Sequence, residues 1–301
     1  MGFHYIKSTL FDVHLGMAET PQTLGITKEL FNSELSHLLN DRELKTQFQM
    51  LCEQFCGLSP AMQVLEKNSL LSRPQVEQFS NAISLLKEQQ PIQYILGEAD
   101  FYGMKLKVNP AVLIPRPETE ELVALIVANN KVQNPRILDI GTGSGCIPIA
   151  LKKKLTTAEV WAVDVSESAL TIAKDNALQL QTEIRFVQDD ILNPQADYPK
   201  FDIIVSNPPY VPEKDKLEME AHVLEHEPHL ALFVEDADPL LFYREIGIFA
   251  QKYLNAGGQL YFEIHRDYFA ENKALAISQG FENVALIKDI NENYRILSTV
   301  K

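Results

Sequence analysis

Ile137-Leu-Asp-Ile-Gly-Thr-Gly-Ser-Gly-Cys146 is the stretch of the chain that decides the fold. Its apolar start predicts a buried strand, alternating glycines follow, and a helical pattern begins directly after them. Glycine lets the backbone approach a ligand closely because no Cβ intervenes. Ligands of open α/β sheets bind at the carboxyl ends of the strands. We therefore expect a cofactor-binding loop made of Gly141, Thr142, Gly143, Ser144 and Gly145.

Strand and helix patterns alternate around this loop throughout residues 118–301. We expect strands at 136–140, 159–165, 184–188, 202–205 and 259–264, helices at 147–155, 168–180 and 239–254, and a turn at Gly257-Gly258. Such alternation predicts a parallel sheet with helices on both faces. At the end of the chain, residues 284–288 and 295–300 flank a tight polar connection and predict an antiparallel hairpin. This layout is typical of the seven-stranded, Rossmann-like class I methyltransferase sheet, an α/β fold.

The first 88 residues have a helical pattern and carry no chemical motif. Apolar spacing predicts helices at 27–39 and 41–55, with Asn40 between them, and Gly57 is expected to end the second helix. Ser59-Pro60 begins a short segment, and Ser72 with Pro74 is typical of a helix start. Residues 91–96 and 105–108 have β-like patterns and predict a β-hairpin linker. We thus expect an N-terminal helical, partner-recognition domain at 1–88, a linker at 89–117 and a catalytic domain at 118–301.

Composition excludes several classes of protein. The formal net charge of −14 argues against stable nucleic-acid binding, which depends on clustered Lys and Arg. No apolar run reaches the roughly 18 residues of a membrane span, and the N-terminus lacks the pattern of a signal peptide. We therefore expect a cytoplasmic protein without membrane association. The cysteines Cys52, Cys56 and Cys146 are too few for a disulfide framework, and we expect no metal site because no second ligand pair accompanies Cys52 and Cys56.

The spacing of the glycine loop favours one cofactor without excluding another. A dinucleotide site is typically Gly-x-Gly-x-x-Gly, and here the third glycine comes one residue early. Asp164 closes the second expected strand, where a carboxylate can accept hydrogen bonds from both ribose hydroxyls of NAD or of S-adenosylmethionine. Asp139, under the loop, favours a cationic sulfonium ligand over a pyrophosphate. After the third strand, Asp189-Asp190 can accept a hydrogen bond from an adenine amino group.

Ser206-Asn-Pro-Pro-Tyr-Val211, at the end of the fourth expected strand, decides between these cofactors. Consecutive prolines fix the backbone and remove two N–H donors, so the nearby carbonyls face outward without internal partners. The side-chain carbonyl of Asn207 and the backbone carbonyl of Pro208 can then accept both hydrogens of a planar –NH2 group. With Pro209 fixing the turn, Tyr210 can lie across the face of that group. The motif predicts methyl transfer from S-adenosylmethionine to an amide or amino nitrogen.

Together these motifs resemble the release-factor glutamine N5-methyltransferases, the HemK/PrmC family. Most of the chain is covered, and the distinctive stretches are 91–97, 101–103, 141–145, 206–211 and Leu113-Ile-Pro-Arg-Pro-Glu-Thr-Glu120. The resemblance implies that S-adenosylmethionine is held by the glycine loop, Asp164, Asp190, Ile191 and Asn207. It also implies that Asn207, Pro208, Pro209 and Tyr210 hold the substrate, a glutamine in the Gly-Gly-Gln loop of class I peptide-chain release factors.

The identity of the methylated partner depends on departures from the family pattern and on alternative methyl acceptors. Glu263-Ile-His-Arg-Asp-Tyr268 replaces an expected Glu-Ile-Gly followed by Gln, with His265 at the glycine position, and 234–238 replaces the usual glycines. We expect these changes to affect partner docking and not the chemistry. A ribosomal-protein glutamine methyltransferase would use the same chemistry on another partner. A DNA adenine-N6 methyltransferase would use the same motif on a flipped base, but it needs a basic face. A non-catalytic binding module fits poorly with intact motifs.

Overall fold

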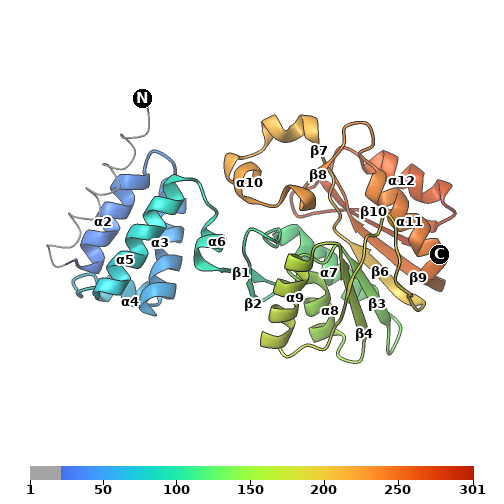
Figure 1. Cartoon of the computed structure of the whole chain (residues 1–301), viewed down its shortest axis with the longest axis horizontal. Coiled ribbons are helices and arrows are strands. Elements are labelled where there is room, and N and C mark those ends of the chain that lie inside the picture. Colours follow the sequence, from blue (N-terminus) through green and yellow to red (C-terminus); the bar gives the residue numbers. More distant parts are fainter. Residues whose placement is uncertain (1–21) are drawn as a thin grey trace. The chain divides into compact units, whose positions relative to one another are not determined.

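The structure is a computed structural model that describes residues 22–301. The chain divides after Leu96 into two compact units. The first unit is helical, and the second contains a large mixed sheet with helices on both faces (Figure 1). The prediction that the N-terminus lacks a signal peptide concerns residues outside the described part of the chain.

The helical unit contains α2 (Leu24–Leu35), α3 (Asp41–Cys56), α4 (Pro60–Leu65), α5 (Arg73–Lys87) and α6 (Ile92–Leu96). Asn40 caps α3, since its side chain accepts from the backbone N–H groups of Arg42 and Glu43. Gly57 ends α3 in the left-handed conformation, at a φ of 66°. These two predictions are confirmed. The rings of Phe31, Phe48 and Phe79 pack together in the core of the unit, which is separate from the cores of the sheet.

Residues 92–96 form the helix α6, so the β-like run predicted at 91–96 is wrong. The carbonyl of Pro91 accepts hydrogen bonds from the backbone N–H groups of Tyr94 at 3.0 Å and Ile95 at 3.2 Å. A run this short fits either period, and tertiary burial of Ile92 and Tyr94 selects the helix. The boundary between the units therefore lies after Leu96 and not after residue 88.

The hairpin consists of β1 (Glu98–Phe101) and β2 (Met104–Lys107), joined at Tyr102 and Gly103, which both have positive φ. It belongs to the second unit, because Phe101, Met104 and Leu106 pack into the core beneath the sheet. Asn176, fully buried, binds both the N–H of Lys107 at 2.7 Å and its carbonyl at 3.0 Å. The hairpin is thus fixed to the sheet unit, whereas the sequence predicts it as part of a linker over residues 89–117.

The seven-stranded sheet has the order β10-β11-β9-β6-β3-β4-β5. Its strands are β3 (Arg136–Ile140), β4 (Glu159–Asp164), β5 (Arg185–Gln188), β6 (Phe201–Ser206), β9 (Leu254–Glu263), β10 (Glu282–Lys288) and β11 (Tyr294–Val300). The pairs from β5 to β9 are parallel, and β11 is antiparallel to both of its neighbours. The predicted fold class and the final antiparallel hairpin are confirmed.

Gly257 and Gly258 lie inside β9, so the turn predicted at these glycines is wrong. The pairing with β6 passes from Phe201↔Leu254 to Ile203↔Gln259, which leaves extra residues in β9. Such an irregularity is a β-bulge, where glycine is favoured because the backbone leaves the regular strand conformation. Gly257 has a φ of 75°, and its N–H donates to the carbonyl of Lys301 at 3.0 Å.

Helices cover both faces of the sheet (Figure 1). On one face lie α7 (Pro117–Asn129), α8 (Cys146–Lys154) and α9 (Glu167–Gln179), and on the other lie α11 (Leu241–Tyr253) and α12 (Phe269–Ser278). Alternate strand residues supply the two cores, as Ile137 and Leu138 illustrate. The helices α7 and α12 are additions to the sequence prediction. Proline at the first position of α7 is compatible with a helix start.

Residues 211–234 connect β6 to α11 through short elements. They are β7 (Val211–Pro212), the 3-10 helix η1 (Glu213–Glu218), α10 (Ala221–His226), the 3-10 helix η2 (His229–Ala231) and β8 (Phe233–Val234), with β7 and β8 paired in parallel. Among residues 22–301, no helix combines the length and the apolar character that crossing a membrane requires.

Candidate active site

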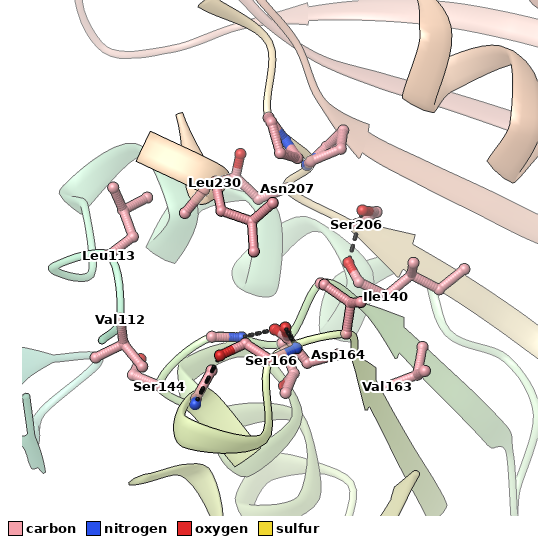
Figure 2. A pocket seen from close by; sticks show the side chains of 18 of the residues that line it. Val112, Leu113, Ile140, Ser144, Val163, Asp164, Ser166, Ser206, Asn207 and Leu230 are labelled. Carbon is pink, nitrogen blue, oxygen red and sulfur yellow. Dashed lines mark hydrogen bonds between the residues drawn. The ribbon is translucent and has the colours of Figure 1, made fainter. Parts of the chain in front are cut away.

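A cavity of about 280 Å³ lies at the carboxyl ends of the central strands. Its walls come from the ends of β3, β4, β5 and β6, and from residues within 111–116 and 228–231. Figure 2 shows Asp164 and Ser166 near one end of the cavity, with Asn207 and Leu230 near the other. The glycine loop and the Asn-Pro-Pro segment, which are far apart in the sequence, therefore face one space.

The three glycines of the loop are needed for two different reasons. All have positive φ, at 73° for Gly141, 53° for Gly143 and 80° for Gly145. A Cβ at Gly145 would lie 3.1 Å from the Cβ of Ala173, so this glycine permits close packing of α8 against α9. Gly141 and Gly143 both line the cavity, and a Cβ at either position would meet no protein atom within 4 Å. That open space fits the expected cofactor loop.

Asp164 holds the loop in place. Its Oδ2 accepts from the N–H of Gly143 at 2.9 Å, and its Oδ1 accepts from the N–H of Ser166 at 2.9 Å (Figure 2). Burial raises the pKa of the Asp164 carboxyl above its ordinary value, against the effect of these backbone donors. An ionised carboxylate has about four lone-pair sites, so it can accept further hydrogen bonds from a ligand.

The two acids after β5 have different surroundings. The carboxylate of Asp189 accepts from the N–H groups of Gln195 and Ala196 and from the hydroxyl of Tyr198 at 2.8 Å. These contacts order the loop that follows β5. The side chain of Asp190 accepts a hydrogen bond from the N–H of Leu192 at 2.9 Å, and Asp189, Asp190 and Ile191 all line the cavity.

The Asn-Pro-Pro segment begins where β6 ends. The hydroxyl of Ser206 donates to the carbonyl of Ile140 at 2.7 Å, which ties the end of β6 to the end of β3 (Figure 2). Asn207, Pro208 and Pro209 follow and line the cavity. The Nδ2 of Asn207 donates to the hydroxyl of Thr119 at 3.4 Å, so its Oδ1 occupies the other arm of the carboxamide.

Tyr210 does not line the cavity. Its hydroxyl donates to Oε1 of Glu263 at 3.3 Å, and its ring packs edge-on against His265 at a centroid distance of 5.8 Å. Burial raises the pKa of Tyr210 above its ordinary value, with the nearby Glu263 charge adding to the shift. The stacking of Tyr210 on a substrate therefore stays a prediction, and it requires the ring to move from this packing.

A buried ion pair joins the two segments that border the cavity outside the sheet. Glu227 has no exposed side-chain surface, and its Oε1 accepts from Nη2 of Arg116 at 2.6 Å. Its Oε2 accepts from the N–H of Ile114 at 3.2 Å. Leu113 and Leu230, each a few positions from one member of this ion pair, line the cavity (Figure 2). Sequence reasoning marked residues 113–120 as distinctive but missed this role, because Arg116 and Glu227 are 111 positions apart.

The departures from the family pattern lie around Tyr210 and at the end of residues 211–234. His265 packs on Tyr210 and also on Tyr268, at a centroid distance of 5.4 Å. Burial lowers the pKa of His265 below its ordinary value. In 234–238, Asp236 accepts from the N–H of Lys214 at 2.9 Å, and Asp238 pairs with Arg244. The replacements thus have structural partners within the same unit.

A seven-stranded sheet of this order, with a glycine loop after β3 and Asn-Pro-Pro-Tyr after β6, defines a class I methyltransferase. Residues 119–230 match the family described as "Methyltransferase small domain", and residues 33–97 match "PrmC N-terminal domain". The "Crystal structure of Methyltransferase from Pyrococcus furiosus" shares the fold, with a TM-score of 0.50 and 18% identity over 74% of this chain and 98% of that one.

Two curated relatives extend the similarity along nearly the whole chain. A "Release factor glutamine methyltransferase" of Flavobacterium psychrophilum is 46% identical over 271 residues, covering 89% of this chain and 95% of the relative. One of Bacteroides thetaiotaomicron is 44% identical over 265 residues, covering 88% and 95% respectively. The chain therefore belongs to the release factor glutamine methyltransferase family.

Asp139, in β3 below the glycine loop, gives a pH dependence that can be tested. It is fully buried, and neither carboxyl oxygen has a hydrogen-bond partner within residues 22–301. Burial raises its pKa from 3.8 to about 7, with the hydroxyl of Thr142 opposing the shift and the charge of Asp164 adding to it. As the pH rises, the Asp139 carboxyl therefore ionises in the unfolded state before it ionises in the folded state. Its contribution to the stability of the ligand-free fold is present below pH 3.8 and is lost as the pH rises to about 7.

We expect Asp139→Asn to remove this loss of stability. Without ligand, the free energy of unfolding of the variant should exceed that of the wild type increasingly from pH 5 to pH 8, by on the order of 4 kcal/mol at the end. Urea titrations at each pH measure the difference, with the exposed Asp197→Asn as control. Parallel pH profiles of the wild type and Asp139→Asn would contradict the assigned shift.

Proposed function

We propose that this protein uses S-adenosylmethionine to methylate N5 of the glutamine side chain in the Gly-Gly-Gln loop of class I peptide-chain release factors. The observation that carries the proposal is that Asn207 and Pro208 line the same cavity as Gly141 and Gly143. A methyl donor held at the glycine loop and a planar –NH2 group held at Asn207 would then share one cavity. The names of the relatives favour a release factor as the source of that group.

For the cofactor, we propose the residues around the glycine loop as ligands. The loop 141–145 would approach the nucleoside, Asp164 would accept from the ribose hydroxyls, and Asp190 with Ile191 would contact the adenine. Asn207 lies within reach of the same space and completes the set. When bound, S-adenosylmethionine supplies an electrophilic methyl group, and its cationic sulfonium suits the acidic residues Asp139 and Asp164.

The acceptor site must overcome the weak nucleophilicity of an amide nitrogen, whose lone pair is delocalised into the carbonyl. The Asn207 side-chain carbonyl and the Pro208 backbone carbonyl would accept the two N–H groups, which polarises and orients the nitrogen. Holding the nitrogen close to the donor lowers the activation barrier by several kcal/mol, and by up to about 7–11 kcal/mol for well-oriented groups. Positive charge develops on the nitrogen during transfer, and fixed acceptors stabilise it. No strong base is needed, because an N-alkylated amide cation loses its proton readily to water.

The partner distinguishes this proposal from its alternatives. A ribosomal protein would present the same glutamine chemistry, and DNA would present an adenine amino group to the same acceptors. Incubation with labelled S-adenosylmethionine and, separately, release factors, ribosomal proteins and DNA tests all three. We expect label in the release factor, and none in a release factor whose Gly-Gly-Gln glutamine is changed to glutamate. Label in a ribosomal protein or in DNA alone would contradict the proposed partner.

We expect Asp164→Ala to weaken binding of S-adenosylmethionine by about 1–3 kcal/mol, because buried donors lose their acceptor. Part of the loss will come from the loop itself, since Asp164 also accepts from Gly143 and Ser166. Calorimetric titration measures the affinity, and Asp197→Ala, at an exposed acid, is the control. Unchanged affinity in Asp164→Ala would remove this residue from the cofactor site.

We expect Asn207→Ala to reduce turnover by about 10²- to 10³-fold, the usual effect of removing one preorganised polar group. The affinity for S-adenosylmethionine should change far less, because the lost carbonyl serves the acceptor amide. Single-turnover methylation of a release factor and calorimetry measure the two effects. The control is Asn134→Ala, an exposed position before the amino end of β3. A variant that methylates glutamine at nearly the normal rate would refute the role of Asn207.

We also propose that the helical unit recognises the protein partner, since it has its own core and carries no chemical motif. The chain of residues 97–301 should fold, bind S-adenosylmethionine normally, and fail to methylate an intact release factor. The separate cores of the sheet unit are the reason to expect folding. Circular dichroism, calorimetry and the labelling assay measure the three properties. Normal methylation of the whole factor by residues 97–301 would overturn this assignment.

A further inference from the structure

A buried chain of hydrogen bonds joins the first turn of α7, the end of β9 and the residue after β6. The Nδ2 of Asn207 donates to Oγ1 of Thr119 at 3.4 Å, and this hydroxyl donates to Oε2 of Glu263 at 2.6 Å. Thr119 is 2% exposed and Glu263 is 1% exposed. Thr119 and Asn207 line the cavity, whereas Glu263 does not.

The direction of these hydrogen bonds follows from the chemistry of the groups. An ionised carboxylate only accepts, and a threonine hydroxyl has one hydrogen to donate. Once Thr119 donates to Glu263, its oxygen can only accept, so Asn207 must turn its –NH2 group toward Thr119. The carbonyl oxygen of Asn207 is then held on the opposite arm of the carboxamide.

This direction matters because a carboxamide can be turned over with little change in shape, since its oxygen and nitrogen are nearly the same size. In the turned orientation, Asn207 would present N–H donors to an acceptor site that must itself accept from N–H groups. Two facing donors cannot form a hydrogen bond, and the target nitrogen would be neither polarised nor oriented.

Glu263 acts as an acceptor through both of its carboxyl oxygens. Its Oε2 accepts from Thr119, and its Oε1 accepts from the hydroxyl of Tyr210 at 3.3 Å. Burial raises the pKa of Glu263, but both hydroxyl donors and the positive charge of Arg295 oppose that shift. The same carboxylate thus fixes the hydroxyl of Tyr210 and, through Thr119, the carboxamide of Asn207.

We propose that Thr119 and Glu263 are positioning residues that hold the carbonyl oxygen of Asn207 toward the acceptor amide. This inference rests on the proposed function, and it gives a role to Thr119 within the distinctive stretch 113–120. Glu263 acts only through Thr119 and Tyr210, because it does not reach the cavity.

The test compares Thr119→Val, which keeps the shape of the side chain without its hydroxyl, with Thr119→Ser, which keeps the hydroxyl. We expect Thr119→Val to lower kcat for a release factor by about 10- to 100-fold, the cost of misorienting a group in contact with the reacting atoms. The KM for S-adenosylmethionine should stay unchanged, and Thr119→Ser should restore most of the kcat. In the Asn207→Ala background, Thr119→Val should cause no further loss, since its effect passes through Asn207.

A merely structural Thr119 would give a different pattern. Wild-type kcat in Thr119→Val, or an equal loss in the Asn207→Ala background, would overturn the inference. Where Thr119→Val fails to fold, Glu263→Gln provides the same test, because a glutamine can donate to Thr119 as well as accept and no longer fixes the direction. We expect Glu263→Gln also to lower kcat without raising the KM for S-adenosylmethionine; full activity would count against the proposal.

A measurement without turnover separates this inference from the proposed function. The side-chain NH2 signals of Asn207, assigned by their disappearance in Asn207→Ala, report the hydrogen bond to Thr119 in the full-length protein by NMR. We expect these signals to shift and their exchange with water to accelerate in Thr119→Val, but not in Thr119→Ser. Unchanged signals in Thr119→Val would refute the orientation, whatever substrate the enzyme has. Absence of glutamine methylation by the wild type would instead refute the proposed function alone.

Discussion

The hydrogen-bond register of three parallel strands is the constraint on which the site depends. In the ladder, Ile140 of β3 is paired with Val163 of β4 on one side and with Ser206 of β6 on the other. The residues that follow these three are Gly141, Asp164 and Asn207. A parallel sheet brings the carboxyl ends of its strands to one edge, so a cofactor loop, its carboxylate and an acceptor motif meet there without any further device. A shift of one residue in β6 would turn Asn207 to the other face of the sheet.

The buried acids around this edge are stabilised in different ways. Burying a charge is costly unless it is paired or hydrogen-bonded. Glu227 has the guanidinium of Arg116 and a backbone N–H, and Glu263 has two hydroxyl donors near Arg295. Both therefore act as fixed connections between segments. Asp139 has no such partner, and its pKa rises to about 7. Asp139 lies beneath the glycine loop 141–145, where a cationic ligand would bring positive charge.

The hairpin and the stretch 113–120 connect the parts of the sheet unit. Asn176 binds Lys107 of β2 and also donates to the carbonyl of Ser144 at 2.9 Å, so the hairpin supports the glycine loop. Glu120 accepts from the N–H of Tyr102 at 2.7 Å, and Thr119 and Arg116 reach Glu263 and Glu227. The stretch 113–120, which the sequence places around the end of a linker, therefore connects segments that border the cavity.

The sequence by itself determined the features that depend on local order along the chain. Strand and helix periods predict the seven-stranded sheet, and the glycines, Asp164 and Asn207 are recognisable because each lies at the carboxyl end of a predicted strand. Only the tertiary structure decided the rest. Residues 91–96 fit either the helix or the strand period, and burial selects the helix. The hydroxyl of Tyr210 points toward Glu263, whose carboxylate accepts its hydrogen bond, and not into the cavity. Thr119 and Glu263 are 144 positions apart, so their contact leaves no local pattern and exists only where α7 packs beside the end of β9.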